Sequence, residues 1–142
     1  MQATKVPMSF WLVVGLALLW NLFGLFSFYS HFTATPAVIA SWPEAQQQIA
    51  AATPRWIYVA FAAATIGGVL GSLGLLLRKR WAVPVLLLSL LAIVVQFGSV
   101  YALTPAWALS GIGGVILPLC IGLFGLFLWW YAGKAAARGW LG

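Results

Sequence analysis

The chain has 142 residues, of which 64% are hydrophobic and only 6% are charged. A soluble domain carries about 25% charged residues, so this chain lacks the polar side chains that would coat a small globule in water. The composition suits a lipid bilayer, and the single cysteine excludes a secreted fold held together by disulfides.

The net charge of +6 does not indicate a nucleic-acid partner. A nucleic-acid-binding surface gathers Lys and Arg into a patch or stripe, whereas these residues stand at the ends of apolar runs. We therefore expect the bilayer to be the main partner of this chain, together with another membrane protein or a second copy of itself.

Four apolar runs follow one another along the chain, and none contains Asp, Glu, Lys or Arg. A hydrocarbon core about 30 Å thick needs roughly 20 helical residues, and each run is long enough. The sequence predicts an all-α, polytopic fold with one membrane domain, residues 1–142, in which four transmembrane helices form an antiparallel bundle. The expected spans cover residues 7–32, 56–77, 81–103 and 109–132.

The basic residues predict the orientation, since cytoplasmic loops of membrane proteins are enriched in Lys and Arg. With the N-terminus inside, Arg55 is the only one of the seven Lys and Arg residues on the outer side. Both termini are then cytoplasmic. The orienting charges are Arg78, Lys79 and Arg80 in the turn between the second and third spans, with Lys5, Lys134 and Arg138 near the ends.

The longest connection is the outer loop, residues 33–55. Its Ser41-Trp42-Pro43-Glu44 segment has the Ser-x-x-Glu spacing of a helix-capping box. We expect a short interfacial helix here, with Trp42 and Ile49 toward the membrane and Gln46 and Gln47 toward water. Such a helix would cover the bundle, or act as a mobile lid or partner-docking element.

Small residues are expected to bring the helices together, because lipid supplies no hydrophobic drive for their association. The second span carries a glycine-rich ridge that includes a GxxxG pair, and the fourth span carries further glycines. These contacts lie within the chain or between subunits. The expected helix-packing residues are Gly67, Gly71, Gly74, Gly122 and Gly125.

One polar or polarisable residue in each span falls at a similar depth. Counted from the cytoplasmic ends, Asn21, Thr65, Gln96 and Cys120 lie within about one helical turn of one level. Lone amides are costly in hydrocarbon, so we expect Asn21 and Gln96 to face inward, where they can bond each other. The buried polar layer either joins the helices by hydrogen bonds or forms a pocket for a small neutral solute.

The residues needed for most enzyme chemistry are missing. His31 is the only histidine and Glu44 the only acidic residue, so paired carboxylates, a Ser-His-Asp triad and a zinc site are all excluded. We expect no enzymatic activity, no metal and no cofactor of the chain's own. His31 remains a remote candidate for contact with a haem or pigment held by a partner.

Several segments resemble a known group of proteins. They are Leu18-Leu19-Trp20-Asn21-Leu22-x-Gly24, Trp42-Pro43-Glu44-Ala45, Pro54-x-Trp56 and Leu77-Arg78-Lys79-Arg80-Trp81-Ala82. Together they resemble small four-helix proteins of the bacterial inner membrane, poorly characterised as a group, some of which carry a loose sugar-transporter label. The resemblance covers about residues 8–103 and implies location in a bacterial inner (cytoplasmic) membrane.

Two functions remain compatible with these observations. The sequence favours a non-catalytic accessory or stabilising subunit of a larger inner-membrane complex, because the chain is small and carries little chemistry. The alternative is a small transporter of a neutral solute such as a sugar, acting as a dimer, since no charged residue lies within the spans.

Overall fold

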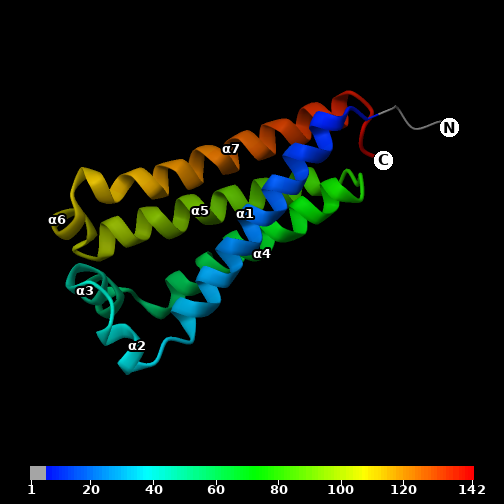
Figure 1. The fold of residues 1–142 in the computed structure, drawn as a ribbon. Helices are drawn as coiled ribbons and strands as arrows, with labels where there is room; N and C mark the ends of the chain where they lie inside the picture. Colours follow the sequence, from blue (N-terminus) through cyan, green and yellow to red (C-terminus); the bar gives the residue numbers. More distant parts are fainter. Residues whose placement is uncertain (1–5) are drawn as a thin grey trace.

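The structure is a computed structural model that describes residues 6–142, apart from the side chain of Ser110; Lys5 lies outside the described residues. The described chain is helical and contains no strand (Figure 1). Four stretches of helix are long and apolar enough to cross a membrane, which indicates a membrane protein and confirms this part of the prediction.

The four long helices run antiparallel in chain order and form an elongated bundle (Figure 1). They are α1 (Met8–Phe32), α4 (Arg55–Leu76), α5 (Ala82–Leu103) and α7 (Ile116–Ala137). One end of the bundle carries the C-terminus, the start of α1 and the α4–α5 turn, and is called the termini end below. The other, the loop end, carries α2 (Pro36–Ala40), α3 (Glu44–Ala52), α6 (Ala106–Ser110) and the 3-10 helix η1 (Ile112–Val115).

The first three long helices begin and end within one residue of the expected spans, but the fourth differs at both ends. Gly111 has φ +63° and separates α6 from the helix that follows, so the fourth stretch starts at Ile112. At its other end the helix continues through Lys134 to Ala137. The predicted end of this span lies where the sequence becomes polar. The helix continues past that point and ends just before Gly139, whose φ of +75° turns the backbone.

The capping box expected at Ser41 is not formed. Ser41 instead ends a helix that the sequence reading missed, α2, and its Oγ donates to the carbonyl of Val38. The start signal of α2 is Thr35, whose side chain accepts from the Val38 amide, followed by Pro36. Helix α3 therefore begins later, at Glu44.

Helix α4 lies at the centre of the packing, because its glycines point toward two neighbours. A Cβ placed on Gly67 would lie 3.1 Å from Ser89 Cβ, and one on Gly71 would overlap Leu86, both on α5. A Cβ on Gly68 would overlap Asn21 on α1. The absence of side chains at these positions allows α5 and α1 to approach α4 closely.

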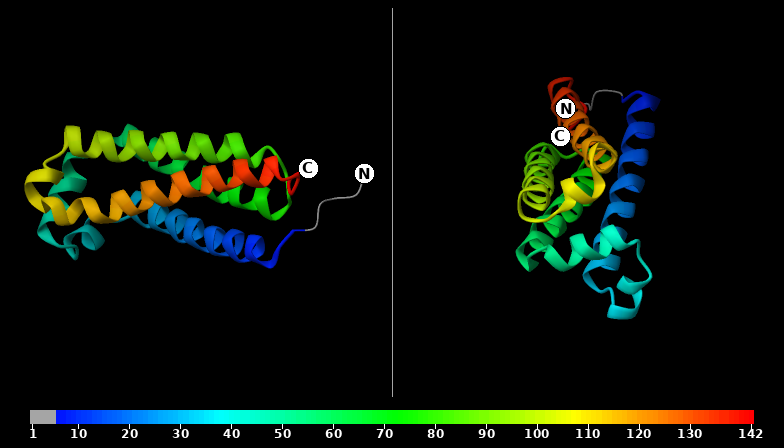
Figure 2. Two further views of the ribbon diagram at one scale, coloured as in Figure 1. Left: turned by 90° about the horizontal axis from the view of Figure 1, so that it is seen from above. Right: turned by 90° about the vertical axis from the view of Figure 1, so that its left-hand side faces the viewer.

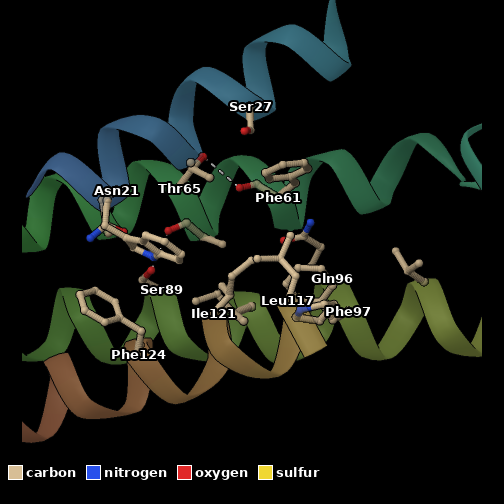
Figure 3. Close-up of a pocket in the computed structure, with 18 of the residues that line it drawn as sticks. Asn21, Ser27, Phe61, Thr65, Ser89, Gln96, Phe97, Leu117, Ile121 and Phe124 are labelled. Carbon is tan, nitrogen blue, oxygen red and sulfur yellow. Dashed lines mark hydrogen bonds between the residues drawn. The ribbon is translucent and has the colours of Figure 1, made fainter. Parts of the chain in front are cut away.

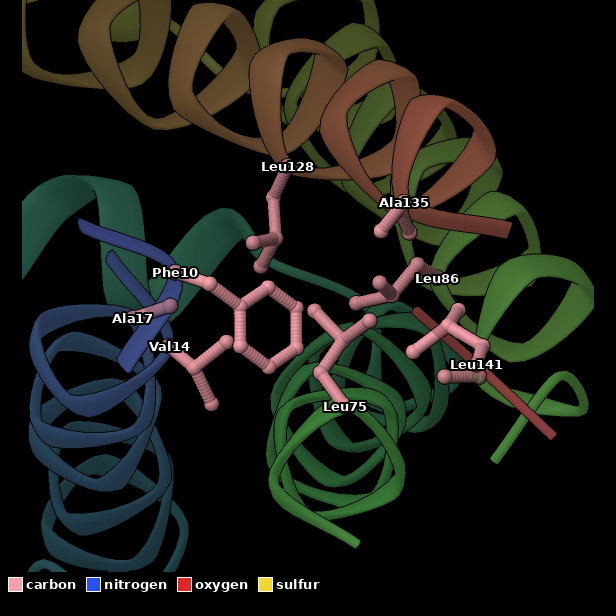
Figure 4. Close-up of a cluster of buried hydrophobic side chains, with 10 residues drawn as sticks. Phe10, Val14, Ala17, Leu75, Leu86, Leu128, Ala135 and Leu141 are labelled. Atoms are coloured by element: carbon pink, nitrogen blue, oxygen red, sulfur yellow. The ribbon is translucent and has the colours of Figure 1, made fainter. Parts of the chain in front are cut away.

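A hydrophobic core fills the termini end of the bundle (Figure 4). Phe10, Leu75, Leu86 and Leu128, from four different helices, meet there and are almost fully buried. The segment after α7 closes this end, since the Gly142 amide donates to the carbonyl of Arg78 at 2.7 Å. The Arg78 Nε in turn donates to the carbonyl of Trp140 at 2.8 Å.

In the view of Figure 1, α1 and α7 diverge toward the loop end, while the core cluster joins their side chains at the termini end. Figure 2 shows the bundle from above and from its loop end. Their aromatic contacts join Phe10 to Tyr131, at 6.3 Å between ring centroids, and Trp20 to Phe124, at 5.6 Å. Beyond this point α1 stays with α4, while α7 follows α5. The bundle is therefore packed at one end and open between α1 and α7 at the other.

We predict that alanine at Gly71 lowers stability relative to alanine at Gly98. Both positions lie inside long helices, but a Cβ at Gly98 would meet nothing within 4 Å. Overpacking costs about 1–3 kcal/mol, whereas replacing an unconstrained helical glycine gains up to about 1 kcal/mol. Thermal unfolding of Gly71→Ala and Gly98→Ala in one detergent measures the difference. Equal melting temperatures would show that α4 and α5 are not closely packed here.

Candidate functional site

A cavity of about 490 Å³ lies where the helices separate (Figure 3). Its walls come from α1, α4, α5 and α7, and residues of α3 and α6 line it at the loop end. The core cluster around Leu86 and Leu128, which themselves line the cavity, closes it toward the termini end. This volume is within the range of sites that bind small molecules.

Most of the lining is apolar or aromatic. Trp20, Phe61, Phe97 and Phe124 contribute large rings from all four long helices. A limited set of polar side chains is placed among them: Asn21, Ser27, His31, Gln46, Thr65, Ser89, Gln96 and Tyr101. A predominantly apolar wall with a few polar groups is typical of a site for a small organic molecule.

Three of the four hydroxyl groups of this set, those of Thr65, Ser89 and Tyr101, are held by backbone carbonyls. Thr65 Oγ1 donates to Phe61 O at 3.0 Å, within its own helix, and Ser89 Oγ donates across to Ala64 O at 2.6 Å. Tyr101 OH donates to Gly114 O at 2.6 Å. Each of these three hydroxyl groups has thereby used its hydrogen, and its oxygen keeps lone pairs that can still accept, whereas the Ser27 hydroxyl bonds to no described residue.

The two amides at this level differ in their bonding. Asn21 Nδ2 donates to Ala17 O at 2.8 Å and to Ser72 Oγ at 3.2 Å, which ties α1 to α4. Gln96 is only 6% exposed, yet its side-chain amide bonds to no other described residue. No described side-chain N or O atom that is fully enclosed lacks a partner, so the polar atoms of Gln96 border open space. Figure 3 shows this amide directed between the helices.

The cavity wall carries no formal charge. Of the described residues that line it, none is Asp, Glu, Lys or Arg. His31 lies at the loop end, where its Nδ1 is 2.8 Å from Ser27 O and its ring centroid is 5.0 Å from that of Trp42. Within residues 6–142, no three His, Cys, Asp or Glu side chains are grouped as a metal site would require.

One opening of the cavity, called the mouth below, lies between α1 and α7. Phe23 on α1 and Leu117 on α7 both line the cavity, yet they are 66% and 62% exposed. Side chains that border the cavity and the outer surface at once mark where the two connect. Both belong to candidate membrane spans. At the loop end the lining residues His31, Gln46 and Gly113 are exposed as well, so the cavity also opens there.

Three of the four residues expected in a polar layer line this one cavity: Asn21, Thr65 and Gln96. Cys120 does not belong with them, because it is exposed on α7 and outside the lining. The partner of the Asn21 amide is Ser72 on the adjacent helix, so the expected bond to Gln96 is not formed. Depth along a helix follows from residue counting, whereas the direction of a side chain around the helix does not.

Of the glycines expected at helix contacts, all but one lie at such a contact. A Cβ on Gly74 would lie 2.9 Å from Ala82 Cβ, and one on Gly125 would lie 3.2 Å from Ile93 Cδ1. With Gly67 and Gly71, these positions permit close helix contacts. Gly122 does not, because a Cβ there would meet nothing within 4 Å.

The sequence reading missed Ser27, Ser89 and Tyr101 as lining residues. Ser89 could have been found by its depth, since it lies two helical turns before Gln96 on the same face of α5. Tyr101 lies near the end of the third span, where aromatic residues commonly mark the membrane boundary, so its position alone does not indicate a site. Its bond to Gly114 depends on the turn between α5 and α7, which carries no local signal for this contact.

No protein-family model matches this sequence, and comparisons with curated proteins and with solved structures found no match.

We predict opposite effects on stability for the two amides. Gln96→Leu should leave the melting temperature unchanged or raise it, because the amide has no protein partner to lose. Asn21→Leu should lower stability by about 0.6–1.7 kcal/mol, the range for hydrogen bonds between membrane helices. Thermal unfolding of both variants in detergent tests this. Its control is Asn21→Leu in a Ser72→Ala background, where the cost should shrink; a larger loss for Gln96→Leu than for Asn21→Leu would contradict it.

Proposed function

We propose that the chain binds a small uncharged molecule in this cavity and takes part in its passage through the membrane. The buried amide of Gln96, directed into open space without a protein partner, is the observation that carries the proposal. An unsatisfied buried amide costs about 1–3 kcal/mol, and a ligand that bonds to it offsets this cost.

The lining supports an uncharged ligand. An ion moved from water into a cavity walled by apolar side chains loses its hydration, and no described lining residue offers a formal countercharge. Aromatic rings supply apolar contact area, while the Thr65 and Ser89 oxygens supply hydrogen-bond acceptors. A neutral molecule with a few polar atoms fits this arrangement.

The proposal includes an orientation. The termini end carries Lys79, Arg80, Lys134 and Arg138, all exposed, so we assign it to the cytoplasm. The cavity then occupies the outer half of the bundle, beneath α3, which we place on the outer membrane surface. The resemblance noted above favours a bacterial inner membrane.

In a Cys120→Ser chain with cysteine at Lys79, labelling of intact cells by a membrane-impermeant maleimide would contradict this orientation.

A second candidate function, an accessory subunit, draws support from α7. Only 6% of the fourth apolar stretch is buried within the chain, and Gly122 and Cys120 lie on α7 without close contacts inside the bundle. A partner helix or a second copy of the chain would cover this face. The two functions are compatible, because such a contact leaves the cavity free.

The expected result for the wild-type chain is one small neutral molecule recovered per chain after purification in mild detergent and extraction into organic solvent. Mass spectrometry of the extract identifies and counts it. Gln96→Leu should reduce its recovery about tenfold, since loss of one or two hydrogen bonds in a buried site is worth about 1.4 kcal/mol or more.

The matched control is Gly98→Ala on the same helix, which should retain the molecule. Equal recovery from Gln96→Leu and wild type would refute the role of the Gln96 amide. If nothing is recovered, uptake of neutral solutes by reconstituted vesicles no faster than by empty vesicles would refute the proposed function.

A further inference from the structure

Several polar side chains that line the cavity can accept a hydrogen bond from a ligand but cannot donate one. Thr65, Ser89 and Tyr101 have each given their hydroxyl hydrogen to a backbone carbonyl, so they present only lone pairs. Both hydrogens of the Asn21 amide are also used within the protein. These four side chains offer acceptors and no free hydrogen, whereas the Gln96 amide and the Ser27 hydroxyl can still donate; no described lining residue is a carboxylate.

A complementary ligand must bring hydrogens of its own. A neutral hydroxyl group meets this need, because it can donate to an acceptor such as Thr65 or Ser89, and at the level of Gln96 it can bond to the free amide. All three side chains line the cavity; Figure 3 shows Thr65 on the side of α1 and α4, and Ser89 and Gln96 on the side of α5. A ligand that only accepts, such as an ether, would leave the hydroxyl oxygens unused.

The route into the cavity limits the rest of the ligand. The mouth lies between Phe23 and Leu117, within two membrane-spanning stretches, and is lined by apolar side chains. Toward the loop end the cavity is bordered by Gln46 and Ile49 of α3. A molecule that arrives through this mouth must first dissolve in the bilayer, which requires an apolar body.

We infer that the ligand is a neutral amphiphile that carries a hydroxyl group, and that it enters sideways from the bilayer between α1 and α7. Its hydroxyl donates to the oxygen of Thr65 or Ser89, or bonds to the Gln96 amide, which lies two helical turns from Ser89 on α5. Its apolar body lies against the aromatic wall and emerges past Phe23 and Leu117. This inference rests on the proposed function and specifies the chemical class of the molecule bound.

The test uses the full chain in lipid nanodiscs and a photoreactive probe, a twelve-carbon alcohol with a diazirine on its chain. The competitors are 1-dodecanol, its methyl ether, glycerol and dodecyltrimethylammonium. Methylation removes the hydrogen and keeps the oxygen and the apolar body, so the ether is the matched control for the donor. Glycerol keeps the hydroxyls without the body, and the ammonium keeps the body with a charge.

The probe is expected to label residues around Phe23 and Leu117, and 1-dodecanol should prevent labelling at a concentration at least tenfold below that of its ether. Thr65→Val, which keeps the side-chain shape, and Gln96→Leu should each weaken labelling about five- to tenfold, while Gly98→Ala should not. Equal competition by the ether, stronger competition by glycerol or the ammonium, or unchanged labelling of both variants would overturn the inference but leave a cavity that binds. Probe labelling that no competitor reduces would overturn the proposed function as well.

Discussion

The close approach of α4 to α5 on one side and to α1 on the other determines the shape of the rest of the bundle. Gly67 and Gly71 bring the backbone of α4 against Ser89 and Leu86, and Gly68 leaves room for Asn21. Because these contacts fix α1 and α5 on different sides of α4, α7 can pack well against only one of them. It follows α5, so the gap toward α1 stays open at the loop end, and the core of Figure 4 closes it at the termini end.

Some polar side chains of the long helices hold the bundle together, and others border the cavity. In an apolar medium each polar group needs a partner, and most of these find one in a neighbouring backbone or side chain, as Asn21 does in Ser72. Gln96 is the contrasting case, since its side chain is buried in the bundle and its amide borders the cavity. A buried amide without hydrogen bonds lowers the stability of the fold. A bound molecule that bonds to the Gln96 amide would offset this cost.

Hydropathy was enough to predict the four long helices, because uncharged runs of more than twenty residues have few alternatives. It could not predict where the fourth helix ends, since Gly139 and not the loss of hydrophobicity turns the chain. Residue counting placed Asn21, Thr65, Gln96 and Cys120 at one depth, and the first three line the cavity. Cys120 could not be placed around α7, because that helix is apolar on every side and its sequence carries no preferred inner face. The cavity itself depends on how α1 and α7 diverge, which no local pattern encodes.

The cavity exists because α1 and α7 are joined at one end and apart at the other, and two distances between spin labels in lipid nanodiscs test this most directly. In a Cys120→Ser chain, one pair of labels replaces Met8 and Lys134 at the termini end, and the other replaces Tyr29 and Ile116 at the loop end; all four positions are exposed. We expect a longer distance for the loop-end pair than for the termini-end pair. Equal, short distances at both ends would mean that the helices pack along their whole length and leave no cavity between them.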